Sequence, residues 1–192
     1  MQAIIDFILE LEKLKGVERK TRPLGLDRYE NSAEHSWQLA LMALSLAHFA
    51  ESTIDINRVV RMLLVHDIGE IDIGDTIVFA EGGWEERKAA ELAAVQRIFR
   101  MLHSERAEEF LALWQEFERA ETAEARFANA MDRAMPMLLN LANEGQSWRE
   151  NGISYERVIG RNAPPIKAGC PALWDYLEPR LEEAKGKGLF GT

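Results

Sequence analysis

The sequence predicts an all-α protein, and three observations support this prediction. Apolar residues recur every three or four positions over most of the 192 residues, as on one face of an amphipathic helix. Residues typical of helix caps stand directly before several of these apolar runs. The sequence shows neither strand-helix-strand alternation nor internal repeats. A composition of 47% hydrophobic and 29% charged residues is typical of a globular chain.

The first predicted helix spans residues 4–14 and leads into a basic loop. Its apolar positions have helical spacing: Ile4, Ile5, Ile8, Leu11 and Leu14. Gly16 is expected to end it. Residues 17–31 lack sustained periodicity and contain Pro23 and Gly25, which favours a loop. This loop is locally basic in an acidic chain, with Arg19, Lys20, Arg22 and Arg28.

Two helices are expected between residues 31 and 68. Asn31, with Glu34 three residues later, has the pattern of a capping box and predicts a helix that ends near Glu51. Asp55 is a candidate cap for a second helix over residues 56–68. This helix is apolar on most sides, so we expect it to be central and buried, with Gly69 at its end.

The second half of the chain predicts further helices separated by loops. Residues 71–83 contain three glycines and favour a loop. Helices are expected over residues 84–102, 107–119 and 123–143, the last capped by Thr122. Prolines are then expected to break the chain before a last helix over residues 172–185, in which Pro179 would introduce a kink: Pro164, Pro165 and Pro171.

Length and charge limit the organisation and the partners. The length suits a single domain over residues 1–192, with a core at about 4–143 and a C-terminal extension at 144–192. A net charge of -9 would repel polymeric nucleic acid, whereas a small phosphorylated metabolite remains compatible with a local basic cleft. The first residues do not resemble a signal peptide, no apolar run is long enough for a membrane span, and there is one cysteine. We therefore expect a cytoplasmic protein.

Ligand-type side chains stand in three of the predicted helices, each among apolar residues. His66 and Asp67 adjoin within the most apolar helix, and His35 shares a helical stripe with Leu39 and Met42. Asp132 lies in a similar stripe of the helix after Thr122. Buried carboxylates and charged imidazoles are costly unless they are paired, hydrogen-bonded or bound to a metal.

One shared divalent cation would satisfy all four groups at once. Two imidazoles and two carboxylates suit Mn, Fe, Co, Ni or Zn and leave coordination positions open for water and substrate. Taken singly, each residue also has an ordinary explanation, as a core histidine or as half of an ion pair. Their joint order along the chain, one on each of three helices, favours the metal site, with His35, His66, Asp67 and Asp132 as ligands.

At these residues the sequence resembles the HD superfamily of metal-dependent phosphohydrolases. The pattern His, His-Asp, Asp on a helical scaffold defines that superfamily. The stretches at residues 31–36, 64–70 and 74–76 are similar to the branch that contains bacterial 5'-deoxynucleotidases and HD-domain-containing protein 2. The resemblance covers about residues 4–143, and it implies an HD-domain helical bundle with one metal site between helices.

The resemblance also implies roles for further residues. Glu70, three residues after the His-Asp pair, corresponds to an acidic residue that serves in catalysis in this branch. The resemblance implies that Asp75 helps in catalysis and substrate binding at the substrate end, and that Thr76 is a substrate-binding residue. An upstream arginine grips the phosphate, a role for which both Arg19 and Arg22 compete, with Arg19 favoured. Only His103 lies between the His-Asp pair and Asp132, which favours one metal over two.

The expected function is therefore hydrolysis of a phosphomonoester, with deoxyribonucleoside 5'-monophosphates as the implied substrates and a homodimer as the implied assembly. Three alternatives stay open: a non-catalytic module that senses a metal or nucleotide, a hydrolase of another phosphorylated metabolite, and a helical interaction protein. Three roles are also open for residues 144–192, which could cap the site, mediate dimerisation or complete the bundle.

Overall fold

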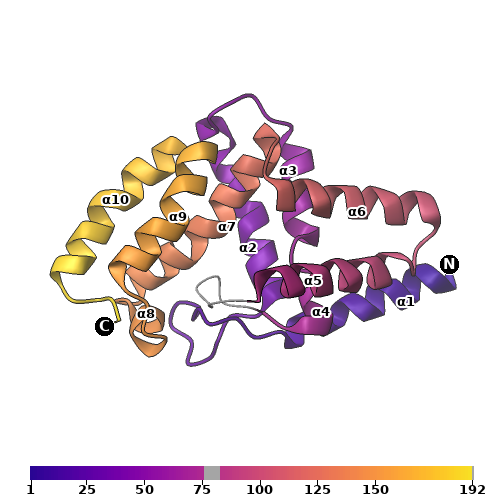
Figure 1. Ribbon diagram of the computed structural model, residues 1–192, viewed down its shortest axis with the longest axis horizontal. Helices are drawn as coiled ribbons and strands as arrows, with labels where there is room; N and C mark the ends of the chain where they lie inside the picture. Colours follow the sequence, from indigo (N-terminus) through magenta and orange to yellow (C-terminus); the bar gives the residue numbers. More distant parts are fainter. Residues whose placement is uncertain (76–82, 192) are drawn as a thin grey trace.

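The computed structural model describes residues 1–75 and 83–191, apart from the side chain of Trp84. The predicted all-α fold is confirmed: across the described ranges every regular element is a helix, and the single β-bridge joins Glu18 and Asn31. The helices are shown in Figure 1: α1 (Gln2–Leu11), η1 (Glu12–Gly16), α2 (Ser32–Leu46), η2 (Ala47–Phe49), α3 (Ile56–Val65), α4 (Glu70–Ile73), α5 (Trp84–Phe99), α6 (Ser104–Arg119), α7 (Ala123–Ala142), α8 (Gln146–Glu150), α9 (Tyr155–Gly169) and α10 (Pro171–Gly186).

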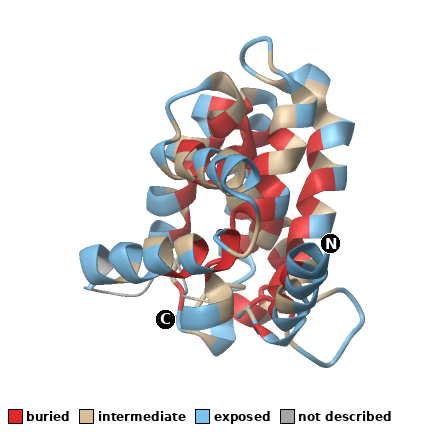
Figure 2. Ribbon diagram, turned by 90° about the vertical axis from the view of Figure 1, so that its right-hand side faces the viewer, coloured by how far each residue is buried: buried red, intermediate tan, exposed pale blue. Residues whose placement is uncertain are grey.

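Helix α7 is central to the bundle and contacts α2, α3, α6, α9 and α10. The residues that α7 buries are mostly apolar. Figure 2 shows that the buried residues of the bundle lie toward its interior and the exposed ones on its outside. One core includes Phe7 from α1, Met62 from α3 and Leu181 from α10. The two ends of the chain therefore share a single hydrophobic core. None of the helices in the described residues is long and apolar enough to cross a membrane.

The predicted helix caps are confirmed. The side chain of Asn31 accepts a hydrogen bond from the backbone N–H of Glu34, whose own carboxylate accepts from the backbone of Asn31, so the capping box is complete. The side chains of Asp55 and Thr122 likewise accept hydrogen bonds from backbone N–H groups in the first turns of α3 and α7. Each cap satisfies backbone donors that the first helical turn leaves free, and so it fixes where the helix begins.

The region after α3 differs from the prediction. The helix ends at Val65 rather than Ile68, and α4 occupies part of the expected loop. Between them the backbone forms tighter bonds, from Ile68 N–H to the Val65 carbonyl and from Glu70 N–H to the Asp67 carbonyl. A Cβ at Gly69 would lie 2.7 Å from Cγ of Glu91, so this glycine permits α5 to pack directly on the turn.

The expectation that prolines break the chain near residue 164 was wrong. Helix α9 contains both Pro164 and Pro165, and it begins at Tyr155, directly after Ser154, whose side chain caps it. Each proline removes one helical N–H, but α9 packs along the length of α7 and buries several apolar side chains there. This burial outweighs the lost hydrogen bonds. Pro171 stands at the first position of α10, where the absent N–H would have no helical partner.

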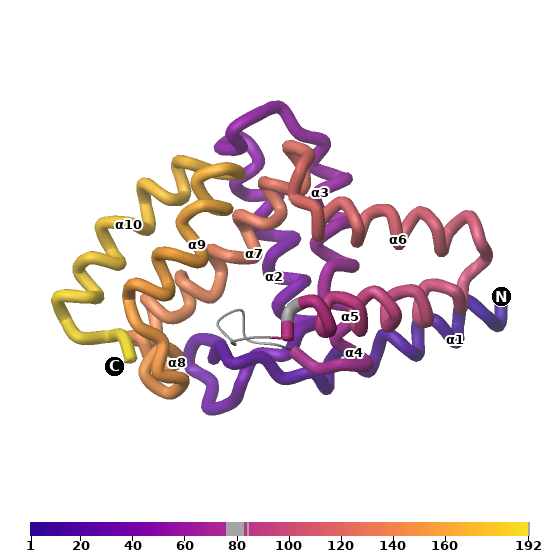
Figure 3. Tube along the Cα trace, viewed as in Figure 1, coloured from indigo at the N-terminus to yellow at the C-terminus, as the bar shows by residue number. Residues whose placement is uncertain are grey.

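Residues after Asn143 complete the bundle. Leu173, Trp174 and Leu177 of α10 belong to the common core. The chain end is held against α8, because the ring of Phe190 stacks on Trp148 at 4.4 Å between centroids and an interplanar angle of 14°. Figure 3 shows α8 beside the segment 17–31. Of the three roles left open for this region, completing the bundle is the one visible in the packing.

Candidate metal centre

Three ligand-type side chains, from α2, from the C-terminal end of α3 and from α7, converge at one point. His35 lies one turn after the Asn31 cap, His66 follows the last residue of α3, and Asp132 lies midway along α7. Oδ1 of Asp132 is 3.1 Å from Nε2 of His35 and 3.8 Å from Nε2 of His66. One ligand atom from each residue lies within 4.8 Å of the others. The fourth predicted ligand is adjacent, with Oδ1 of Asp67 3.1 Å from Nε2 of His66.

The proton positions make this cluster a good fit for a cation. Nδ1 of His66 lies 2.8 Å from the Leu63 carbonyl and must donate to it, which leaves Nε2 with a free lone pair. That buried Nε2 has no hydrogen-bond partner within the described part of the chain. The lone pair faces carboxylate oxygens of Asp67 and Asp132, which are also acceptors. Acceptors that converge in a buried space require positive charge between them, and these residues fit a divalent metal.

The pKa shifts of Asp132 and His66 both indicate a site that favours positive charge. Burial raises the pKa of Asp132, but its contacts with His35 and His66 outweigh burial and hold this pKa well below the ordinary value. Burial lowers the pKa of His66, yet the carboxylates of Asp67 and Asp132 outweigh it and raise the pKa overall.

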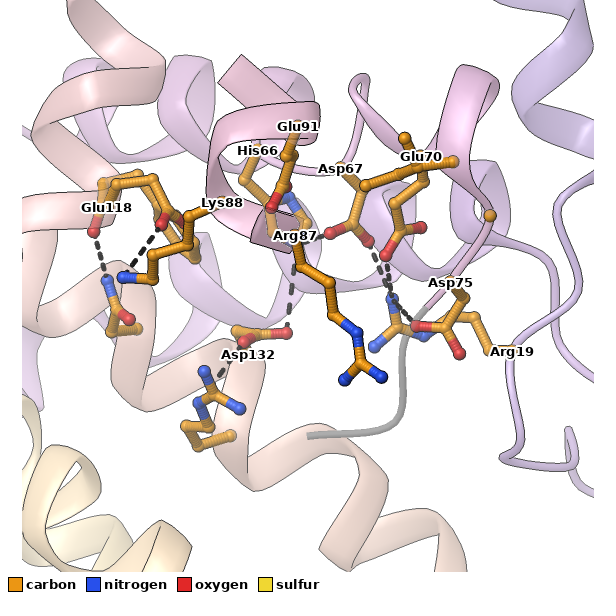
Figure 4. Close-up of a pocket in the computed structure, with 15 residues that line it drawn as sticks. Arg19, His66, Asp67, Glu70, Asp75, Arg87, Lys88, Glu91, Glu118 and Asp132 are labelled. Atoms are coloured by element: carbon orange, nitrogen blue, oxygen red, sulfur yellow. Dashed lines mark hydrogen bonds and ion pairs between the residues drawn. The ribbon is translucent and has the colours of Figure 1, made fainter. Parts of the chain in front are cut away.

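A polar cleft of about 220 Å³ opens beside these ligands (Figure 4). Basic and acidic side chains from several helices surround it. The cleft residues drawn and labelled are Arg19, His66, Asp67, Glu70, Asp75, Arg87, Lys88, Glu91, Glu118 and Asp132. A cleft that presents both cationic groups and buried carboxylates next to a metal site can hold a small anion and move its protons.

Glu70 and Asp75 lie together on one side of the cleft. Oε2 of Glu70 accepts a hydrogen bond of 2.6 Å from the hydroxyl of Ser32. Burial, reinforced by the charge of Asp67, raises the pKa of Glu70 well above its ordinary value. Burial also raises the pKa of Asp75. The pair therefore shares a region in which a carboxylate readily takes up a proton.

The two candidate arginines have different environments. Nη1 of Arg19 lies 2.8 Å from Oδ2 of Asp67 and 3.9 Å from both Glu70 and Asp75, inside the cleft. Burial lowers the pKa of Arg19, but the surrounding carboxylates, Asp67 foremost, outweigh it and raise the pKa.

Arg22 instead pairs with Glu150 and Asp27 and stacks on the ring of Tyr29 at 4.6 Å. It is not among the described residues that line the cleft. Thr76, the remaining predicted substrate residue, lies outside the described residues.

Several residues around the cleft were not predicted from the sequence as site residues. The helix at residues 84–102 was interpreted only as a generic helix, although the spacing of three and four between Arg87, Lys88 and Glu91 could have indicated a polar face. Burial, with the nearby charge of Glu118, raises the pKa of Glu91 to about 7. Glu30, buried behind His35, carries no local sequence signal, since only the folded chain brings it there.

Known proteins with similar sequences belong to a family whose expected metal site matches this arrangement of side chains. The family model of the HD domain matches residues 11–174. The chain belongs to the HD-domain family. Its relatives include 5'-deoxynucleotidase HDDC2 of Homo sapiens, 28% identical over 169 residues that cover 86% of this chain and 81% of the relative. The corresponding protein of Dictyostelium discoideum is 31% identical over 163 residues, covering 81% of this chain and 86% of the relative.

Two solved structures are similar over nearly the whole chain. A crystal structure described as a predicted metal-dependent phosphohydrolase from Magnetospirillum magnetotacticum has a TM-score of 0.93 and 41% identity, covering 100% of this chain and 95% of that one. A Pyrococcus horikoshii protein has a TM-score of 0.63 and 25% identity, with 94% and 97% covered.

The predicted family is confirmed: this is an HD-domain phosphohydrolase related to the HDDC2 5'-deoxynucleotidases. The family match extends past Asn143 into α10, farther than the resemblance noted in the sequence.

Proposed function

We propose that this HD-domain protein hydrolyses phosphomonoesters, and that its substrates are deoxyribonucleoside 5'-monophosphates. The observation that carries the proposal is the convergence of His35, His66 and Asp132 beside a cleft that also holds Arg19 and Glu70. His35, His66, Asp67 and Asp132 would hold one divalent cation, of which Mn, Co, Fe, Ni and Zn are all compatible with the donor set. When bound, the cation would supply Lewis acidity toward a phosphate oxygen and a lowered pKa of water.

The protein's own side chains divide the remaining work. Glu70 accepts the proton of the attacking water, a role that suits a carboxylate whose pKa burial raises well above its ordinary value. Arg19 binds the phosphate through its guanidinium, which faces the cleft from beside Asp67. Asp75 assists at the substrate end, within reach of the same guanidinium.

The choice of substrate is supported by the relatives. Those at 28% and 31% identity are 5'-deoxynucleotidases, which favours a nucleoside monophosphate over other phosphomonoesters. The net charge of -9 disfavours polymeric nucleic acid as a ligand. A homodimer is proposed on the same resemblance as the substrate.

Phosphate release from a panel of 5'-deoxyribonucleoside and ribonucleoside monophosphates tests the proposal. Metal-stripped protein should be inactive and should regain activity with Mn or Co. Glu70→Gln should abolish turnover without preventing metal binding, whereas the same change at the exposed Glu85 should leave turnover intact.

Tight metal binding with no turnover of any nucleotide would contradict the proposed activity. The protein would then act on another phosphoester or would serve as a non-catalytic sensor module.

A further inference from the structure

A buried glutamate, Glu30, stands behind the metal ligands and outside the cleft. Its side chain is 2% exposed, and its Oε2 lies 3.4 Å from Nδ1 of His35 and 3.6 Å from Nε of Arg19. Beyond these contacts, none of the three atoms has a hydrogen-bond partner within the described residues. A carboxylate removed from water needs polar partners. Here one carboxylate is shared between an expected metal ligand and the expected phosphate-binding arginine.

The backbone of Glu30 and of the following Asn31 connects the same two residues, Arg19 and His35. Its carbonyl accepts a hydrogen bond of 2.8 Å from the N–H of Arg19, and its own N–H donates to the carbonyl of Thr21 at 2.8 Å. The next residue, Asn31, caps α2, and its carbonyl accepts from the N–H of His35 at 3.0 Å. Glu30 therefore lies at a fixed junction between the basic loop and the helix that carries His35.

The two rings of the metal centre each present Nδ1 to an acceptor on the side away from Asp132. Nδ1 of His66 forms a hydrogen bond of 2.8 Å with the Leu63 carbonyl, and Nδ1 of His35 makes a longer contact of 3.4 Å with the carboxylate of Glu30. In both rings Nε2 points toward Oδ1 of Asp132. A histidine that donates its Nδ1 proton keeps a lone pair on Nε2, and a carboxylate acceptor also increases the basicity of that nitrogen.

We propose that Glu30 is a positioning residue that sets the tautomer of His35 and, through its second contact, the orientation of Arg19. This inference rests on the proposed function, because it assigns the ring to a metal and the guanidinium to a phosphate. Glu30 touches neither metal nor substrate. It links the metal site to the phosphate site, because a movement of its carboxylate would displace both His35 and Arg19.

The first test observes the wild-type protein loaded with zinc. Imidazole ¹⁵N NMR, with His35 assigned through His35→Gln, should show a protonated Nδ1 and a metal-bound Nε2 for this ring. A His35 ring that is protonated on Nε2 in the zinc-loaded protein would overturn the proposal, and no substitution at Glu30 is needed to see it.

The second test compares Glu30→Gln with Glu18→Gln, which makes the same change at an exposed glutamate that forms a β-bridge with Asn31, the residue after Glu30. Isothermal titration with zinc should give an affinity about 10–100-fold weaker for Glu30→Gln, the usual effect of losing such a partner, and an unchanged affinity for the control. The KM for the phosphomonoester should also rise, because Arg19 loses its second support.

The outcomes separate the two proposals. A wild-type protein that binds no zinc at His35, His66 and Asp132 would overturn the metal-dependent function and this inference with it. Wild-type turnover together with Glu30→Gln that binds zinc as tightly as the wild type would overturn the inference alone, even if the variant melts at a lower temperature.

Discussion

At the residue scale, the metal centre is defined by which atoms carry protons. His66 donates from Nδ1 to a backbone carbonyl, so its Nε2 faces two carboxylates as a fellow acceptor. A neutral imidazole beside two ionised carboxylates would leave buried lone pairs in mutual contact, at a cost in free energy of about 1–3 kcal/mol for each unsatisfied group. A cation removes that cost. This is the physical reason for assigning a metal to these residues.

The first prediction, also at the residue scale, concerns the substitution of Arg19. Replacing it by lysine keeps the charge but loses the planar pair of donors that fits a phosphate. We expect Arg19→Lys to raise KM for a phosphomonoester by about 10–100-fold, as loss of one charge-assisted hydrogen bond of about 1.5–3 kcal/mol implies. Steady-state kinetics on metal-loaded protein measures this.

Arg28→Lys is the matched control, because Arg28 pairs with Glu34 on the surface of the same loop. Equal effects of the two substitutions on KM would show that the loop as a whole, rather than the guanidinium of Arg19, determines phosphate affinity.

At the element scale, Asn143 after α7 and two residues of α8 hold the basic loop that carries Arg19. The Asn143 side chain donates to the carbonyl of Arg22 at 2.9 Å, and the Ser147 hydroxyl donates to the carbonyl of Lys20. Nε of Arg22 is 3.1 Å from the carboxylate of Glu150. Arg22 therefore anchors the loop to α8, whereas Arg19 points into the cleft.

The contact between α9 and α7 gives a second prediction, from a matched pair of glycines in one helix. A Cβ at Gly169 would lie 2.1 Å from the Arg126 carbonyl oxygen, whereas a Cβ at Gly160 would meet nothing within 4 Å. Gly160→Ala should raise the free energy of unfolding by about 0.5–1 kcal/mol, the gain in helix propensity. Gly169→Ala should lower it by more than that amount, because the backbone of α7 must move.

Urea denaturation followed by circular dichroism gives both values. A midpoint for Gly169→Ala at or above that of the wild type would show that α9 does not need its close approach to α7.

At the scale of the whole molecule, the metal would join helices that are far apart in the sequence. His35 lies on α2, His66 directly after α3 and Asp132 on α7, and all three helices contribute to the single core. A ligand that binds only the folded chain stabilises the whole fold.

The third prediction follows from this linkage. Metal at 100 times its Kd should add about 2.7 kcal/mol to the free energy of unfolding of the wild type, and a chelator should remove that gain. Asp132→Asn keeps the shape of the side chain but removes its charge, so most of the gain should be lost. Thermal unfolding with and without metal measures it.

Asp175→Asn, at an exposed position of α10, should respond to metal as the wild type does. A metal-induced shift that survives in Asp132→Asn would place the cation elsewhere.

The sequence by itself determined the all-α fold, the caps at Asn31, Asp55 and Thr122, and the family, because these depend on local periodicity, local hydrogen bonds and short motifs. It also singled out His35, His66 and Asp132 as ligand-type residues in apolar stripes. Tertiary structure decided the rest. It kept Pro164 and Pro165 inside a helix, because packing against α7 outweighs their lost hydrogen bonds.

Tertiary structure also separated Arg19 from Arg22, which both competed for the phosphate in the sequence, by giving Arg19 the carboxylates of the cleft and Arg22 the carboxylate of Glu150. It brought Glu30 behind His35 through a β-bridge and a helix cap. These placements depend on contacts between segments far apart along the chain. A local pattern of residues does not show which distant segments will meet, so it cannot predict such contacts.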